Sequence, residues 1–230
     1  MVPLRRLLLK QLLIETNGGV SELSYVHERL NFSDEIFNQL ISELMQEKLI
    51  TISDNTLILT LSQRINIAVK ALELGSDIEV ISRSLNWLEF EELCARVFHQ
   101  NGFKVNRRFR FYAEERRWEI DLFAFKKPWI ILAECKHWSK GMSNSSAMKV
   151  IEVHFEKCRI LAEHFHDVSV KAKVYDRGFY TIIPMALTLS PTPIEIYRQI
   201  PIVSILSFPS FLNDFDGYLT RLVKFKVNIS

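Results

Sequence analysis

The stretch WEIDLFAFKKPWIILAECKHW, residues 118–138, decides how this chain is interpreted. It predicts two apolar strands, at about residues 118–125 and 129–135, whose short connection makes an antiparallel pair. Three charged side chains interrupt these strands: Asp121 on the first, and Glu134 and Lys136 on the second. Burying such charges without partners or a function is costly, so a strand that only fills a core would not carry them.

The alternation of side chains along a strand predicts where these charges meet. Residues two apart share a face, so Asp121 is expected on the side of Glu119 and Phe123, and Glu134 on the side of Lys136. A register that brings Asp121 beside Glu134 gathers two carboxylates and one ammonium near the edge of a sheet. Mg²⁺ prefers carboxylate oxygens, and water bound to it can attack a phosphodiester. A nearby lysine would position that water or take its proton.

The helix that precedes these strands supplies a third acid, Glu91. At helical spacing Glu91 shares an otherwise apolar stripe with four residues. They are Trp87, Cys94, Ala95 and Phe98. Glu89 is predicted to point elsewhere, and Glu92 and Arg96 are predicted to form a surface pair.

The ordered set FEELCARVFHQNGFKV, EID and ECK resembles the PD-(D/E)xK nuclease superfamily, in particular Mrr-type restriction endonucleases and archaeal Holliday-junction resolvases. The resemblance covers about residues 85–165. It implies that Glu91, Asp121, Glu134 and the main-chain carbonyl of Cys135 surround Mg²⁺, for which Mn²⁺ substitutes. It also implies that Lys136 assists the attacking water. Ile120 stands where the family name has proline.

The patterning predicts two domains. Residues 1–75 are expected to form a small α+β winged helix-turn-helix domain, with three helices, the second and third capped by Ser21 and Ser33, and a two-stranded ribbon. Ser62 is expected to cap a further helix. Residues 76–230 are expected to form an α/β domain with a restriction-endonuclease-like mixed central sheet flanked by helices.

The expected elements of the second domain form a mixed order of strands and helices. They are strands at 104–112, 118–125 and 129–135, a helix at 146–164, a strand at 180–187, a short helix begun by Pro193, a strand in PIVSIL, a helix in FPSFLNDF and a strand in RLVKFKV.

Basic residues indicate DNA as the partner. Residues 104–117, KVNRRFRFYAEERR, hold six basic side chains interleaved with aromatic ones, a pattern suited to a phosphate backbone and equally to a solvated strand face. The third helix of the first domain is acidic, so a protein contact there is as plausible as base reading. The expected DNA contacts are Arg107, Arg108, Arg110, Arg116, Arg117 and Lys140.

Composition excludes several classes. The 230 residues are 24% charged and 48% hydrophobic, with a net charge of +2, which argues against disorder and membrane insertion. Three cysteines without zinc-site spacing fit a reducing, cytoplasmic setting. His154, His164 and His166 are expected to be solvated rather than zinc ligands, and no small-molecule cofactor is expected.

These observations predict a Mg²⁺-dependent endodeoxyribonuclease acting in restriction, repair or junction processing. The alternative is a DNA-binding regulatory protein whose nuclease-like domain is inactive. Because cutting both strands usually needs two active sites, a homodimer is expected.

Overall fold

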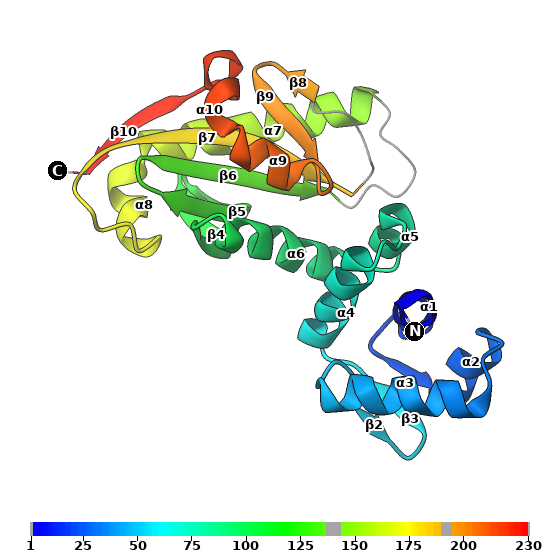
Figure 1. The fold of residues 1–230 in the computed structure, drawn as a ribbon. Helices are drawn as coiled ribbons and strands as arrows, with labels where there is room; N and C mark the ends of the chain where they lie inside the picture. Colours follow the sequence, from blue (N-terminus) through cyan, green and yellow to red (C-terminus); the bar gives the residue numbers. More distant parts are fainter. Residues whose placement is uncertain (1, 137–143, 190–194, 230) are drawn as a thin grey trace. The chain divides into compact units, whose positions relative to one another are not determined.

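The computed structural model describes residues 2–136, 144–189 and 195–229. It divides into two compact units, Met1–Phe90 and Glu91–Ser230 (Figure 1). The first unit contains α1 (Val2–Glu15), β1 (Val20–Glu22), α2 (Leu23–Glu28), α3 (Asp34–Gln46), β2 (Ile52–Ser53), β3 (Thr56–Ile58), α4 (Leu61–Glu73) and α5 (Ile78–Arg83). Helix α6 (Trp87–Gln100) crosses the division between the units.

The second unit continues from α6. Its elements are β4 (Lys104–Ala113), β5 (Arg116–Lys126), β6 (Trp129–Lys136), α7 (Asn144–Glu163), α8 (Phe165–Lys171), β7 (Gly178–Thr188), β8 (Glu195–Tyr197), β9 (Ile200–Ser204), α9 (Phe208–Asn213), α10 (Phe215–Tyr218), the 3₁₀ turn η1 (Leu219–Arg221) and β10 (Phe225–Ile229).

The first unit has the three helices and the ribbon that the sequence predicts. The ribbon β2–β3 turns at Asp54 and Asn55, both with positive φ, and β1 adds to it antiparallel to β3. Ser33 caps α3 as predicted, since its hydroxyl accepts from the Ile36 amide at 3.4 Å. Whether this unit is a winged helix stays a prediction.

Two predicted helix caps in this unit are wrong. Ser21 lies within β1, and α2 begins after Glu22, because Ser21 is taken up by pairing with Leu57. Thr60 rather than Ser62 caps α4, because Thr60 and Gln63 form a reciprocal capping box.

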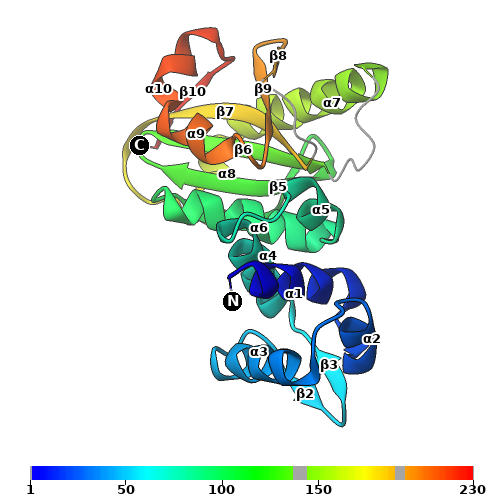
Figure 2. The ribbon, with the colours of Figure 1, turned by 45° about the vertical axis from the view of Figure 1, so that its right-hand side comes forward.

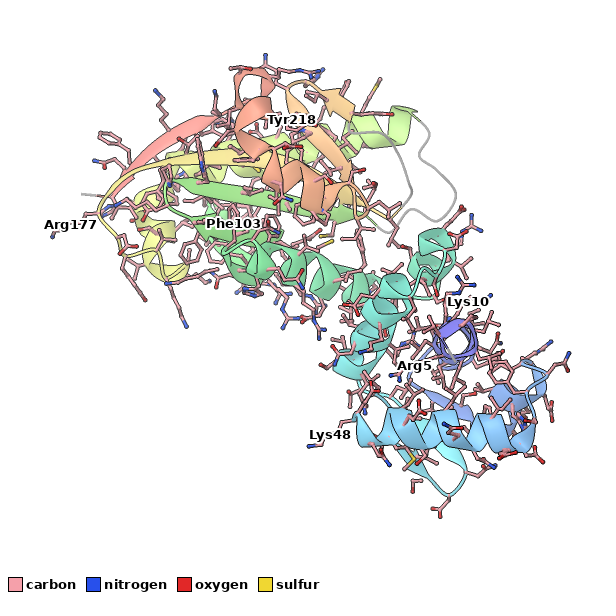
Figure 3. The ribbon with its side chains drawn as sticks, in the orientation of Figure 1. Arg5, Lys10, Lys48, Phe103, Arg177 and Tyr218 are labelled. Atoms are coloured by element: carbon pink, nitrogen blue, oxygen red, sulfur yellow. The ribbon has the colours of Figure 1, made fainter. Side chains whose placement is uncertain are left out.

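Side chains also pair within the first unit. Arg5 of α1 points toward α3 and donates to Glu47 at 2.6 Å (Figure 3). Arg5 also lies 3.5 Å from Glu43 and so offsets part of the acidic charge of α3.

The compact first unit extends past the predicted boundary at residue 75. Helices α4 and α5 pack on α1, and the buried Arg64 of α4 contacts Thr16, Ser84 and Glu89. These contacts explain why the division falls after Phe90. The assignment of the ranges 1–75 and 76–230 to functional domains remains a prediction.

A mixed sheet organises the second unit, as predicted. Its order is β4-β5-β6-β7-β9-β8, with β10 pairing with β7. Strands β4, β5 and β6 form an antiparallel meander, whereas β6–β7 and β7–β9 are parallel. Helices α7 and α8 pack on one face and α9 covers the other (Figures 1 and 2). The ring of Phe98 on α6 packs against that of Phe208 on α9, with the ring centroids 4.8 Å apart.

One predicted element of this unit is wrong. The segment after Pro193 is not a helix but the strand β8, which pairs antiparallel with β9. Arg198 and Gln199 connect the two strands with positive φ, as two-residue hairpin turns require. Two of the three residues of β8, Ile196 and Tyr197, are of the β-branched and aromatic types that favour strands. Pro193 itself lies outside the described residues.

The predicted alternation along β5 also fails at one point. Trp118, Ile120 and Phe123 all join the core cluster on the α7 face, so the side-chain alternation shifts between Ile120 and Phe123. On β4, Arg108 has a φ of 49°, in the left-handed region, between the pairs Arg107↔Leu122 and Phe109↔Ile120. This distortion lies opposite Asp121, at the point where the two-residue period of β5 breaks.

Among the described residues, no helix is both long and apolar enough to cross a bilayer.

Candidate active site

Asp121 and Glu134 lie on neighbouring strands. Strands β5 and β6 pair antiparallel from Lys126↔Trp129 up to Leu122↔Ala133. Beyond that point a side chain takes the place of the backbone acceptor: Asp121 Oδ2 accepts a hydrogen bond from the Cys135 amide at 2.7 Å. The predicted meeting of the two acidic strand positions is therefore present in the structure.

Glu134 is a buried carboxylate surrounded by cations. Only 6% of the residue is exposed. Its Oε1 contacts Lys136 Nζ at 2.8 Å, and its Oε2 contacts Lys157 Nζ at 2.9 Å. The Nδ1 of His154 lies 3.4 Å from the same Oε2. Helix α7 supplies both Lys157 and His154. The site is therefore built from three elements: β5, β6 and α7.

The two carboxylates have opposite electrostatics. Burial raises the pKa of Asp121, the neighbouring Glu134 charge raises it further, and the hydrogen bond from Cys135 only partly offsets this. Burial alone would also raise the pKa of Glu134, but His154, Lys157 and Lys136 together hold it well below its usual range. The ionised form of Glu134 is therefore favoured, whereas at Asp121 burial and the Glu134 charge outweigh the Cys135 hydrogen bond and the charges of Lys136 and Lys157.

Lys136 is favoured as a cation. Burial alone would lower the pKa of its ammonium group, but the hydrogen bond and charge of Glu134 raise it overall. The side chain is 31% exposed, so it reaches the surface beside the two acids.

Glu91 is buried on α6, on the stripe that the sequence predicts. It is 3% exposed and accepts from Arg108 at 3.2 Å. Burial raises the pKa of Glu91, Arg108 lowers it, and the charge of Asp121 raises it again. The charge of Asp121 therefore acts on Glu91, and the carboxylate of Glu91 is held by Arg108.

Other predictions for α6 fare differently. The surface pair Glu92–Arg96 is present at 3.3 Å. Glu89, predicted to point away from the core, is only 2% exposed because it pairs with Arg64. Trp87, predicted on the buried stripe, is 52% exposed.

The donor set at Asp121 and Glu134 suits a hard divalent cation. Two adjacent carboxylates repel each other, and a cation between them would relieve that repulsion. Within residues 2–136, 144–189 and 195–229, however, no three acidic, histidine or cysteine side chains are grouped closely enough to hold an ion. Glu91 is thus not assembled with the other two acids, and its role as a ligand, like that of the Cys135 carbonyl, stays a prediction.

The sequence missed two residues of this site. His154, expected to be solvated, is completely buried, and its Nε2 contacts the Leu132 carbonyl at 2.8 Å. Burial lowers the pKa of His154, but Cys158 and Glu134 raise it to about 10. Lys157 drew no attention as a site residue. A histidine and a lysine three apart on the helix after the acidic strands were the available signal.

The predicted DNA-contacting arginines are all exposed on β4 and β5, and most have intramolecular partners. Arg107 pairs with Glu92, and Arg108 and Arg110 pair with Glu91 and Glu119. The Arg116 guanidinium lies 3.4 Å from the centre of the Trp118 ring. Lys140 lies outside the described residues, as do His137 and Trp138.

Comparison with known families identifies this part of the chain. Residues 82–155 match the family model Mrr_cat, described as restriction endonuclease. This region is similar to restriction endonuclease domains. The resemblance to the PD-(D/E)xK superfamily that the sequence predicts is confirmed, and the matched range contains Glu91, Asp121, Glu134, Lys136 and His154.

Solved structures show only distant likeness to this chain. The protein VC1899 from Vibrio cholerae is 13% identical over 95% of this chain and 57% of its own, with a TM-score of 0.35. The restriction endonuclease FokI is 11% identical over 93% of this chain and 44% of its own, with a TM-score of 0.37. The protein of unknown function AF1548 is 15% identical over 56% of this chain and 66% of its own, with a TM-score of 0.35.

The chain thus spans from 44% to 66% of the lengths of these three proteins. A search of curated proteins found no match.

Proposed function

We propose that the protein is a Mg²⁺-dependent endonuclease that hydrolyses phosphodiester bonds of DNA. The observation that carries this proposal is the pair Asp121 and Glu134 on adjoining strands, with Lys136 on Glu134, inside a region that matches restriction endonucleases.

Each residue has a distinct role in this proposal. Asp121 and Glu134 hold the divalent cation, with Mn²⁺ able to replace Mg²⁺. When bound, such a cation makes a water molecule more acidic and offsets negative charge on the phosphate oxygens. Lys136 places its ammonium charge beside the reacting phosphate and orients the water. Glu91 would join the site only after it is released from Arg108.

The reaction exchanges one bond at phosphorus for another. The oxygen of a water molecule bonds to phosphorus, and one phosphorus–oxygen ester bond breaks. The water loses a proton, and the departing alkoxide takes one up, so the overall step is a hydrolysis without net redox change.

The exposed arginines of β4 and β5 would contact the DNA backbone. Phosphates compete well for arginines in exposed ion pairs, because such pairs contribute little to stability in water. The pairs of Arg107 and Arg110 with their acids are of this exposed kind. We therefore propose that DNA binding weakens steeply with salt.

Plasmid cleavage tests the proposal. Supercoiled DNA is incubated with Mg²⁺ or Mn²⁺ and the parent protein, Glu134→Gln, or Glu163→Gln, which changes an exposed glutamate of α7. The parent and Glu163→Gln should cut at equal rates, and Glu134→Gln should be slower by about a thousandfold or more. Equal cutting by all three proteins would identify a contaminating nuclease and refute the proposal.

One observation favours the inactive alternative. Both oxygens of Glu134 contact protein cations, which compete with a metal ion. A DNA-binding regulator would bind a specific sequence tightly in EDTA and would not cut it with any divalent ion. Filter binding in EDTA, followed by addition of Mn²⁺, separates the two functions.

We also propose a cytoplasmic homodimer, since cutting both strands of a duplex calls for two sites. Light scattering that gives the mass of a single 26.9 kDa chain at working concentration would refute the dimer.

A further inference from the structure

The two oxygens of Glu134 have different surroundings. Oε2 faces α7, where it meets Lys157 at 2.9 Å and the His154 ring at 3.4 Å. Oε1 meets Lys136 at 2.8 Å. Each carboxylate oxygen can accept about two hydrogen bonds. Oε2 therefore has two neighbouring nitrogens, one for each hydrogen bond it can accept, whereas Oε1 has one and retains an acceptor position among the described residues.

The orientation of His154 follows from its neighbours. Its Nε2 lies 2.8 Å from the Leu132 carbonyl, which can only accept, so Nε2 carries a hydrogen. Its Nδ1 is then the atom that faces Glu134. Among the described residues, Nδ1 is the buried side-chain nitrogen or oxygen that lacks a hydrogen-bond partner of normal geometry. The ring is fixed by the β6 backbone, and this directs Nδ1 to the carboxylate.

Both groups come from a rigid element. His154 and Lys157 are three residues apart, so they lie on the same side of α7. This side also contributes Cys158 to the core cluster beneath β6. The contacts with Oε2 are therefore set by helix packing, in contrast to Lys136, whose partly exposed side chain is on the same strand as Glu134.

We propose that Lys157 and His154 are positioning residues that hold Oε2 of Glu134 against α7 and leave Oε1 as the oxygen available to the metal. This inference rests on the proposed function and goes beyond it, because it assigns a role to two residues outside the acid–acid–lysine motif. Lys157 and His154 together prevent the Glu134 carboxylate from rotating or from binding the ion through both oxygens.

A purely stabilising role for Lys157 makes a different prediction. If Lys157 only neutralised a buried charge, its removal would lower stability and weaken metal binding and turnover together. If it positions Glu134, its removal frees Oε2 and also takes away a charge that repels the metal. Metal binding then becomes tighter while turnover falls.

The test uses the full chain with Lys157→Met, which keeps the length of the side chain and removes its charge. Lys157→Arg restores the charge, and Lys171→Met changes an exposed lysine of α8 as a matched control. Mn²⁺ binding is measured by electron paramagnetic resonance without DNA, and plasmid cleavage is measured at saturating Mn²⁺. Melting temperatures verify that all four proteins are folded.

For Lys157→Met we expect cleavage to slow by about tenfold, within the range typical for groups that orient metal ligands. We expect its Mn²⁺ affinity to rise by about threefold. Lys157→Arg should recover most of the rate, and Lys171→Met should match the parent in both measurements.

Two results would overturn the inference: unchanged cleavage by Lys157→Met, or Mn²⁺ binding to Lys157→Met that is equal to or weaker than that of the parent. Unchanged cleavage by the variant beside an active parent leaves the proposed function intact. A parent that never cleaves defeats the proposed function, and the Mn²⁺ titration then still decides whether Lys157 acts on Glu134.

Discussion

The molecule buries carboxylates in two places, and the two are organised differently. In the first unit Glu89 pairs with Arg64, whose guanidinium also donates to the Leu13, Thr16 and Ser84 carbonyls. One negative charge meets one positive charge there, and the donors are satisfied. In the second unit Glu134 has several cationic neighbours, while Asp121 beside it has a raised pKa.

This difference distinguishes a structural ion pair from a candidate active site. A buried pair that only stabilises a fold is balanced in charge and fully hydrogen-bonded, because an unpaired charge or an unsatisfied polar group costs free energy. The Asp121–Glu134 site retains repulsion between acids, and His154 Nδ1 lies 3.4 Å from Glu134 without a hydrogen bond of normal geometry. Such imbalance is typical of sites that bind a ligand or carry out a reaction.

The largest effect on stability is expected at the balanced pair. Arg64→Met should lower the free energy of unfolding of the first unit by about 3–5 kcal/mol, because it leaves Glu89 charged and buried. Urea denaturation followed by circular dichroism measures this change. A loss below about 1 kcal/mol would mean that water reaches Glu89 and that the pair is not structural.

Glu134→Gln should destabilise the second unit by a smaller amount, about 2 kcal/mol, since the neighbouring Lys136 and Lys157 remain partly solvated. The pH dependence follows from the lowered pKa of Glu134. A lowered carboxyl pKa stabilises the folded state at pH above the unfolded value of about 4.3, and this stabilisation is lost as the pH falls below it.

Acid unfolding of the parent should therefore be steeper than that of Glu134→Gln below about pH 4.3. Parallel acid-unfolding curves for the two proteins would contradict the assignment of these cations to Glu134.

Asp121→Asn should raise the free energy of unfolding, whereas Glu134→Gln should lower it. Burial and Glu134 raise the pKa of Asp121, so its ionised form costs stability at neutral pH. Asparagine keeps an oxygen for the Cys135 amide and removes the charge, so the free energy of unfolding should rise by about 1 kcal/mol. Thermal unfolding without divalent ions measures this, with Asp167→Asn as the exposed control. A melting temperature of Asp121→Asn below that of the parent would contradict the proposed repulsion between Asp121 and Glu134.

The smallest effect is expected at an exposed pair in the first unit. Arg83 contacts Glu79 one turn away on α5, and both are exposed. Arg83→Ala should change the free energy of unfolding by less than about 0.5 kcal/mol. A larger loss in urea denaturation would show that exposure alone does not separate the two kinds of ion pair.

Much of the second unit was predictable because its signals are local. The meander follows from a two-residue period interrupted by short turns, and the acids Asp121 and Glu134 could be paired from that pattern. The restriction endonuclease resemblance of this region was visible in the same residues.

The failures arose where distant segments decide the outcome. Glu89 is buried because Arg64, twenty-five residues earlier, reaches it from another helix. His154 is buried because its ring meets the Leu132 carbonyl of β6; its spacing with Lys157 shows a shared helix face but not which strand covers that face. The shift of alternation on β5 lies opposite the left-handed backbone of Arg108 on the neighbouring strand, which the sequence of β5 does not show. Strand pairing can be inferred from local periodicity, whereas the partners of buried charges cannot.

The most direct measurement is the thermal shift that Mg²⁺ produces in the parent and in Asp121→Asn. If the charge of Asp121 serves to hold a cation, Mg²⁺ should raise the melting temperature of the parent and leave that of Asp121→Asn unchanged, because binding stabilises only the state that binds. An equal shift in the two proteins, or no shift in the parent, would contradict a cation site at Asp121 and Glu134.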